Sequence, residues 1–170
     1  MYYIGGKIKS VLPNKLEVDG KIIFNPKWHH FETAGWKKLP VELESVERQF
    51  IKWIDGDPFE MTQEEKDLLL ESYIEKRKKQ MIDQLWQSAT AYEQKFISGS
   101  APTKMLQLAL QGNEKAAAIG VWLEQLWGTY YTRRDLVVAA ETQEDINIIS
   151  EDFSSVGEIP FTVKETIFGA

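Results

Sequence analysis

Histidine and carboxylate side chains lie close together near the N-terminus, where they could perform acid–base chemistry. His29 and His30 are the only two histidines of the chain, and Glu32 follows them. Imidazole and carboxylate groups serve as general acids and bases, and they can also bind zinc. We expect this segment to be helical, and adjacent residues on a helix point in different directions, so the two rings would not share a metal ion. We therefore interpret the three side chains as part of a solvent-exposed helix face.

Two aspartates, Asp55 and Asp57, flank a glycine in the way that a calcium-binding loop begins. Such a loop needs further oxygen ligands and a glutamate at its twelfth position, which is Lys66 in this sequence. Pro58 and Phe59 follow where further ligands would be needed. We therefore predict a turn at this point of the chain and no calcium site.

The basic run 76–79, Lys-Arg-Lys-Lys, is the remaining cluster that could bind an anion. On a helix this run would spread around the cylinder as a solvated face, and Glu71 and Glu75 are spaced to pair with it. The glycines form no nucleotide-binding pattern, and no motif groups serine, histidine and aspartate into a nucleophilic arrangement. The sequence therefore predicts no catalytic residue, no cofactor site and no metal site, and we expect the protein not to be an enzyme.

Composition limits the classes of partner. The chain has 170 residues, of which 43% are hydrophobic and 27% charged, as in an ordinary globular domain. Its net charge of -6 argues against nucleic acid as the main partner. It has no cysteine, no apolar run of the ~18 residues that a membrane span needs, and no secretory signal after Met1. We expect neither a nucleic-acid partner nor a membrane partner.

The segment 114–140 is the longest apolar-rich stretch of the chain, and its periodicity predicts one helix. Residues at helical spacing line one face of it: Ile119, Leu123, Leu126, Tyr130 and Val137. Trp127 and Tyr131 lie four residues apart and point elsewhere. A helix that is apolar on two sides must bury both, so one side should face the domain core and the other a second layer or another chain.

Tryptophan is unusually frequent in this sequence, with six in the chain. These side chains either fill the core of a bundle with a layer on each side of the helix, or some belong to a protein interface, where tryptophan is enriched. We take six aromatic residues as interaction candidates: Trp122, Trp127, Tyr130, Tyr131, Trp28 and Trp36. They could bind another protein or a second copy of the chain in a homo-oligomer.

The N-terminal part of the chain has the alternation and the turn signals of short strands. Residues 1–24 are predicted to form a small antiparallel meander. Its strands are separated by Gly5-Gly6, by Pro13 and by the Asp19-Gly20 hairpin signal. Asn25 is a good helix N-cap, and a short helix should cover 27–34. Residues 41–54 fit a helix or a strand, and a strand is favoured for 49–54.

The rest of the chain has helical patterns. Thr62 and Glu65 form a capping box that begins a helix over 63–97. Its predicted apolar stripe is Leu70, Ile74, Met81, Leu85, Ala89, Tyr92 and Phe96, widened by Ile82 and Trp86. Helices are also predicted over 103–111, 114–140 and 143–150, followed by a tail that is extended except that a last helical turn could form after Pro160.

These patterns predict an α+β fold, with a small N-terminal antiparallel β meander and a short helix, followed by a mainly helical hairpin or bundle. We divide the chain into a β-rich part over 1–57 and a helical part with an extended acidic C-terminal tail over 58–170. Between Asp135 and Val163 the chain carries seven acidic residues and no lysine or arginine. Such a region is usually solvated, and it can also dock a basic partner.

Two groups of residues resemble proteins encoded among the tail and tail-fibre genes of bacteriophages. The first is Gly20 to Pro26 with Ala34-Gly35-Trp36, which is similar to the opening hairpin and Asn-Pro helix start of that group. The second is the aromatic stretch 122–134 followed by the acidic stretch Thr142 to Ile146, with Gly157 and Pro160 in a short tail. Segment 37–61 has no counterpart. The resemblance implies a virion-associated or fibre-assembly role, in the virion or in the cytoplasm of a bacterial host during assembly.

Three functions follow as hypotheses. In the first, a non-enzymatic phage structural or assembly protein binds a tail or fibre protein through the aromatic helix. In the second, a small regulatory module of a host cell binds a basic partner through the acidic region 135–163. In the third, a small enzyme uses His29 or His30 with Glu32. The interpretation of these residues as a solvent-exposed helix face argues against it.

Overall fold

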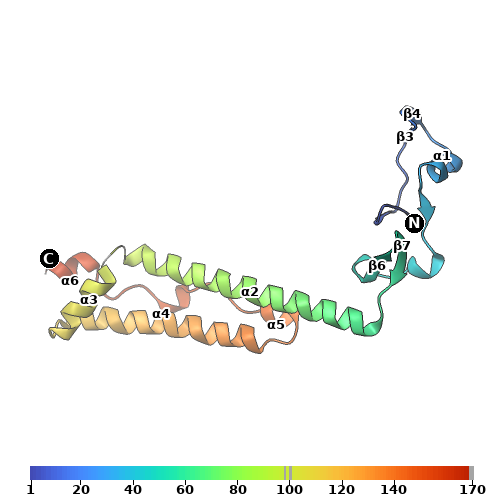
Figure 1. The fold of residues 1–170 in the computed structure, drawn as a ribbon. Coiled ribbons are helices and arrows are strands. Elements are labelled where there is room, and N and C mark those ends of the chain that lie inside the picture. Colours follow the sequence, from blue (N-terminus) through green and yellow to red (C-terminus); the bar gives the residue numbers. More distant parts are fainter. Residues whose placement is uncertain (98, 100, 169–170) are drawn as a thin grey trace. The chain divides into compact units, whose positions relative to one another are not determined.

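The computed structural model describes residues 1–97, 99 and 101–168. The chain forms two compact units, Met1–Leu70 and Glu71–Ala170, which are described separately (Figure 1). The first contains short antiparallel strands and the second is almost entirely helical, so the predicted α+β class is confirmed. The predicted boundary after Asp57 falls inside a strand, whereas the compact units divide after Leu70.

Three small antiparallel sheets make up the strand structure of the first unit. One has the order β2 (Lys7–Lys9), β1 (Tyr2–Ile4), β5 (Lys37–Lys38). The other two are the hairpins β3 (Lys15–Val18) with β4 (Lys21–Phe24), and β6 (Ile51–Ile54) with β7 (Asp57–Glu60). Asp19-Gly20 and Asp55-Gly56 form the turns of these hairpins, and all four residues have positive φ. Aspartate and glycine tolerate that conformation, which is why they are good hairpin signals.

The segment between the sheets contains short helical turns. Helix α1 covers Trp28–Thr33, as predicted, but its N-cap is Lys27 and not Asn25, which has a φ of 48°. The ambiguous segment forms the 3₁₀ turns η1 (Val41–Leu43) and η2 (Arg48–Phe50) before β6 begins. The strand favoured for 49–54 is therefore confirmed over its last four residues.

A small core holds the first unit together. Its buried members are Tyr3 of β1, Leu39 just after β5, Leu43 of η1 and Ile51 of β6. The Tyr3 hydroxyl donates a hydrogen bond of 3.0 Å to Asp57, which also pairs with Lys37. The pKa of Asp57 is lowered by these two hydrogen bonds, and the pKa of Tyr3 is raised by its burial and by the neighbouring carboxylate. Strands β1, β5 and β7 are thus tied together by the polar contacts of Tyr3, Lys37 and Asp57.

Helix α2 runs from Gln63 to Phe96, and the predicted capping box begins it. The Glu65 carboxylate accepts from the Thr62 N–H at 2.7 Å, and the Thr62 hydroxyl accepts from the Glu65 N–H at 3.3 Å. Lys52 of β6 lies 2.6 Å from the same carboxylate. Because both contacts favour the ionised form, the pKa of Glu65 is lowered.

Four further helices and one 3₁₀ turn complete the described part of the second unit. They are α3 (Ala101–Leu110), α4 (Glu114–Ala139), α5 (Gln143–Asn147), η3 (Ser154–Val156) and α6 (Val163–Phe168). Asn113 caps α4 by accepting a hydrogen bond of 3.0 Å from the Ala116 N–H. Helix α6 lies after Pro160, where the sequence allowed a last helical turn in the otherwise extended tail.

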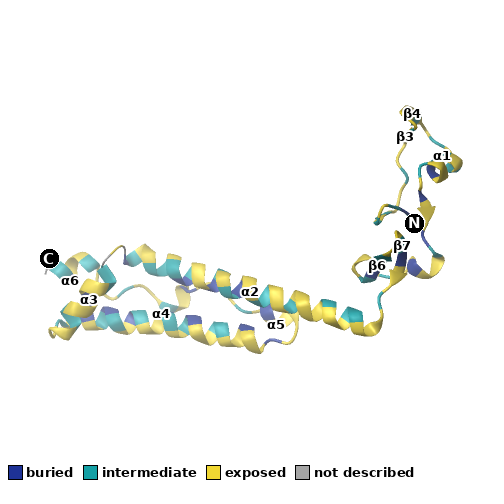
Figure 2. Ribbon diagram, viewed as in Figure 1, coloured by how far each residue is buried: buried dark blue, intermediate teal, exposed yellow. Residues whose placement is uncertain are grey.

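Helices α2 and α4 pack against each other in antiparallel directions (Figure 1). Phe96 contacts Trp122, Trp86 contacts Tyr130, and Lys78 reaches Val138, so residue numbers rise along one helix as they fall along the other. Buried positions alternate with exposed ones along both helices (Figure 2). The core contains most of the predicted stripes: Met81, Leu85, Ala89, Ile119, Leu126, Tyr130 and Val137. Leu70, predicted as part of the stripe, is 42% exposed.

One carbonyl group of the C-terminal segment is hydrogen-bonded to both helices of this pair. The Gly157 oxygen accepts a hydrogen bond of 2.9 Å from Trp122 Nε1 on α4 and one of 3.1 Å from the Tyr92 hydroxyl on α2. Gly157 has φ 81° and ψ 174°, a conformation that is essentially limited to glycine. Phe153, a few residues earlier, is buried in the core. The returning chain is thus a layer of the helical unit.

We expect Gly157→Ala to lower the free energy of unfolding by about 1–3 kcal/mol, because alanine is strained at this φ and ψ. A methyl group at this position meets no atom within 4 Å, so crowding contributes little. Gly128→Ala is the matched control: it lies inside α4 in open space, and should stabilise the protein by about 0.5–1 kcal/mol. Urea denaturation measures both changes. Equal effects of the two substitutions would contradict the role assigned to Gly157.

Candidate functional site

The six aromatic interaction candidates differ widely in burial. Trp122, Tyr130 and Trp36 are 4%, 5% and 8% exposed and belong to the cores of their units. Trp28 is half-buried and stacks on Phe31 within the first unit. Trp127 is half-buried, and Tyr131 is 47% exposed. Of the six, Tyr131 therefore has the largest share of its surface available to a partner.

Tyr131 is part of a cluster of aromatic rings on the surface of the helical unit. We call Trp86, Trp127, Tyr130 and Tyr131 the aromatic face. The Trp86 ring lies 4.9 Å from that of Trp127 and 5.6 Å from that of Tyr130, and Tyr130 lies 5.1 Å from Tyr131. Trp86 is 50% exposed, so α2 and α4 each present one half-exposed ring above the buried Tyr130.

Polar contacts hold the aromatic face in place. Trp127 Nε1 donates a hydrogen bond of 2.9 Å to Glu93 on α2. The Arg134 guanidinium lies 5.0 Å from the centre of the Tyr131 ring and pairs with Asp135 at 2.8 Å. The hydrogen bond to Asp135 raises the pKa of Arg134. A cation over the ring restricts Tyr131 and gives the apolar surface a polar edge.

Trp86 is a surface residue that the sequence analysis placed in the apolar stripe of α2. It directly follows Leu85, which is fully buried. Neighbouring positions on a helix differ by about 100° in direction, so one of two adjacent large apolar residues commonly faces outward. The direct adjacency of Leu85 and Trp86 in the sequence could have identified Trp86 as a surface residue.

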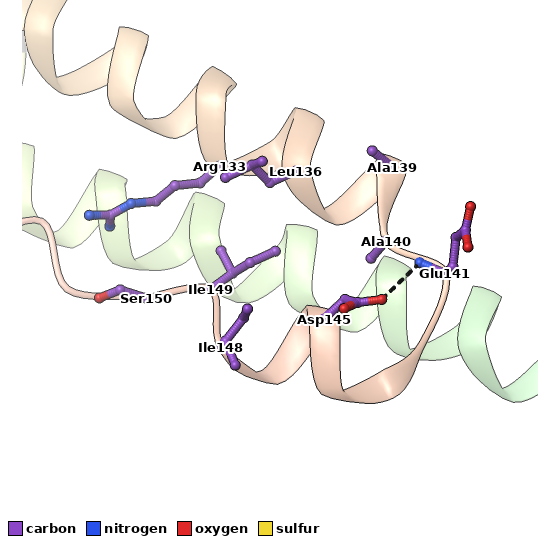
Figure 3. A pocket seen from close by; sticks show the side chains of 9 residues that line it. All are labelled: Arg133, Leu136, Ala139, Ala140, Glu141, Asp145, Ile148, Ile149 and Ser150. Carbon is purple, nitrogen blue, oxygen red and sulfur yellow. Dashed lines mark hydrogen bonds between the residues drawn. The ribbon is translucent and has the colours of Figure 1, made fainter.

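A second surface feature lies where α4 ends and α5 begins. The α4–α5 groove has a volume of about 550 Å³ and is lined by Arg133, Leu136, Ala139, Ala140, Glu141, Asp145, Ile148, Ile149 and Ser150 (Figure 3). Leu136 is 56% and Ile148 82% exposed, and Ala140 is buried. The groove is therefore mainly aliphatic, with charged residues near its ends.

The charged residues of the groove are held by hydrogen bonds. Asp145 closes the capping box of α5: its carboxylate accepts from the Thr142 N–H at 2.9 Å, and the Thr142 hydroxyl accepts from the Asp145 N–H at 3.1 Å. Hydrogen bonds from the Thr142 hydroxyl and backbone lower the pKa of Asp145. Arg133 donates to the Asp152 carbonyl at 2.8 Å and lies over the Phe153 ring. The turn into α5 thereby fixes the Asp145 end of the groove, and the chain after α5 fixes Arg133 at the other end.

The basic run 76–79 was predicted to be a solvated face, and two of its members make structural contacts instead. Lys78 Nζ lies 3.1 Å from the Val138 carbonyl oxygen in the last turn of α4. Arg77 donates to the Asn147 side chain at the end of α5. Cations at helix C-termini satisfy the last carbonyl groups and interact favourably with the helix dipole. These side chains attach the ends of α4 and α5 to α2.

The rings of His29 and His30 lie 3.9 Å apart, so the expectation that they point in different directions was wrong. His30 Nδ1 accepts a hydrogen bond of 3.0 Å from the Lys27 N–H, and the Glu32 carboxylate accepts from Trp28 Nε1. Both groups therefore take part in local contacts of α1. Among the residues that the structure describes, no group of three or more His, Cys, Asp or Glu side chains could hold a metal ion.

No helix in the described part of the chain is long and apolar enough to cross a bilayer. Comparisons with protein-family models, with curated proteins and with solved structures gave no match. The chemistry of the two surfaces is therefore the basis for assigning a function. The aromatic face offers large rings with polar edges, and the α4–α5 groove offers aliphatic walls beside carboxylates.

We expect acid to destabilise the helical unit partly through Asp145. Its folded-state pKa is lowered, so its contribution is present above the unfolded-state pKa of about 4 and is lost as pH falls through the folded-state value. Asp145→Asn should therefore reduce the loss of unfolding free energy between neutral and acidic pH, as measured by urea denaturation. Glu124→Gln, at an exposed position of α4, is the control and should leave the loss unchanged. An identical pH dependence in Asp145→Asn and the unaltered protein would contradict this role.

Proposed function

We propose that this protein is a non-enzymatic structural or assembly protein of a bacteriophage, which binds a tail or fibre protein through the aromatic face. The observation that carries the proposal is that Trp86 and Tyr131, from two different helices, are both about half exposed around the same buried ring. Exposed tryptophan and tyrosine that lie together are typical of protein interfaces.

The physical properties of the aromatic face favour protein binding. Its rings pack on one another and on Tyr130, and Glu93 and Arg134 fix two of them, so they lose little freedom on binding. Tryptophan, tyrosine and arginine are also the residues that most often dominate binding energy. A partner that covers Trp86 and Tyr131 would gain apolar burial at a small entropic cost.

The phage setting is supported by the resemblance of residues 20–26, 34–36, 122–134 and 142–146 to proteins encoded among phage tail and tail-fibre genes. We infer that the protein acts in the virion, or in the cytoplasm of the bacterial host while particles assemble. A second copy of the chain is the alternative occupant of the aromatic face, and sedimentation of the purified protein distinguishes the two. A monomer that binds a tail protein favours the first assignment.

The proposal is tested with a Trp86→Ser, Tyr131→Ser double variant and with tail and fibre proteins released from purified particles. We expect the double variant to bind its partner about 30-fold more weakly or worse, since clustered aromatic residues are the usual hot spots. The matched control is Leu106→Ser with Leu110→Ser, which changes two exposed apolar residues of α3.

Circular dichroism and urea denaturation show whether each variant is folded, and surface plasmon resonance measures its affinity. Equal binding by the double variant and by the α3 control would contradict the proposal. If no tail or fibre protein binds the unaltered chain, the phage assignment fails as well.

The enzymatic alternative is tested by His29→Ala with His30→Ala. Because these side chains are at the surface of α1 or in local contacts, we expect binding to the virion partner and particle assembly to change by less than about twofold. Particle yield and affinity are the measurements. Loss of biological activity in a folded double variant would instead favour acid–base chemistry at α1.

A further inference from the structure

We propose that the α4–α5 groove binds a segment of a partner protein that carries an aliphatic side chain next to a lysine or arginine. This inference goes beyond the function proposed above, because the groove shares no residue with the aromatic face and nothing in the argument requires a viral partner. It rests on three observations: the walls of the groove are apolar, carboxylates line it, and the nearby lysine and arginine side chains contact other groups.

The walls of the groove are aliphatic and accessible. Leu136 projects from the last turns of α4, and Ile148 and Ile149 project from the chain just after α5 (Figure 3). Ile148 is 82% exposed, and Leu136 is 56% exposed. Two aliphatic side chains this exposed, on either side of a hollow of about 550 Å³, can enclose an apolar side chain from outside. Such accessible walls suit a peptide segment that lies along the surface.

Negative charge is concentrated at one end of these walls, opposite Arg133 (Figure 3). Glu141 and Asp145 line the groove, and the whole segment from Asp135 to Val163 contains seven acidic residues without a lysine or arginine. The hydrogen bonds to Asp145 lower its pKa, which favours the ionised carboxylate. In the described part of the chain, no cationic side chain forms an ion pair with Glu141 or Asp145.

The nearby cations are engaged elsewhere. Arg133 donates to the Asp152 carbonyl and covers the Phe153 ring, and Arg134 pairs with Asp135. From α2, Arg77 contacts the Asn147 side chain, and Lys78 contacts the Val138 carbonyl and, at 3.1 Å, Glu75.

The exposed Glu141 carboxylate is therefore available to a cation supplied by a partner, and Asp145, although it accepts the capping hydrogen bonds, adds negative charge nearby. A segment whose aliphatic side chain enters between Leu136 and Ile148 would place an adjacent lysine or arginine within reach of these carboxylates. Complementary charge then selects the partner and speeds association, while apolar burial holds the complex together.

The test uses a short fluorescein-labelled peptide of alternating leucine and lysine, and a matched peptide with glutamate in place of lysine. Fluorescence anisotropy measures binding to the full chain. We expect the lysine peptide to bind, and to bind about tenfold more weakly to Ile148→Ser and, independently, to Leu136→Ser. Glu141→Gln should weaken binding several-fold, and added salt should weaken it further. Leu110→Ser, at an exposed position of α3, should bind as the unaltered protein does.

Backbone amide NMR signals locate the peptide on the protein. We expect the largest shifts among residues 133–150. The proposal is overturned if the lysine peptide does not bind, if the glutamate peptide binds as tightly, or if Ile148→Ser and Leu136→Ser bind it unchanged. It is also overturned if the shifts centre on Trp86 and Tyr131. That result would not contradict the function proposed for the aromatic face. Conversely, failure to bind a tail protein would not by itself contradict the proposal that the groove binds a peptide segment.

Discussion

The carbonyl oxygen of Gly157 accepts hydrogen bonds from side chains of two helices, and the arrangement of the helical unit depends on this contact. Trp122 on α4 and Tyr92 on α2 both donate to it. A buried indole N–H without a partner would cost free energy, so the returning chain must stay in place for Trp122 to remain in the core. Only a residue that tolerates the backbone angles of Gly157 can present the carbonyl in this direction.

This constraint determines which aromatic residues remain at the surface. The returning chain covers Trp122 and contributes Phe153 to the core, and Arg133 is drawn to its Asp152 carbonyl. Trp86 and Tyr131 have no such cover and are about half exposed. The excess of aromatic residues thus divides into a core set and a surface set. The surface set is what we assign to protein binding.

Sequence patterns predicted the helical unit well because its signals are local. The capping box at Thr62 and Glu65 and the helical periodicity of α2 and α4 correspond to observed elements. The hairpin at Asp19-Gly20 is equally local. Each of these features depends on residues within a few positions of one another, so propensity and capping are sufficient to identify it.

Features that depend on distant residues were predicted less well. Trp122 could not be separated from Tyr131 on sequence alone, because its burial follows from a glycine carbonyl 35 positions away. Arg77 and Lys78 were predicted to be solvated. The helix ends that they contact, in α4 and α5, lie far along the chain and could not be anticipated from local patterns. The α4–α5 groove could likewise not be predicted from the sequence, because its walls come together only through the turn into α5.

The claim that the aromatic face docks a phage tail or fibre protein is tested most directly by photo-crosslinking in infected bacteria. A benzophenone side chain would replace Tyr131 in one version of the protein and Leu110 in another, both being exposed positions. Our account predicts that irradiation joins the version altered at Tyr131, and not the version altered at Leu110, to a tail or fibre protein identified by mass spectrometry. No adduct from position 131, or the same adducts from both positions, would contradict it.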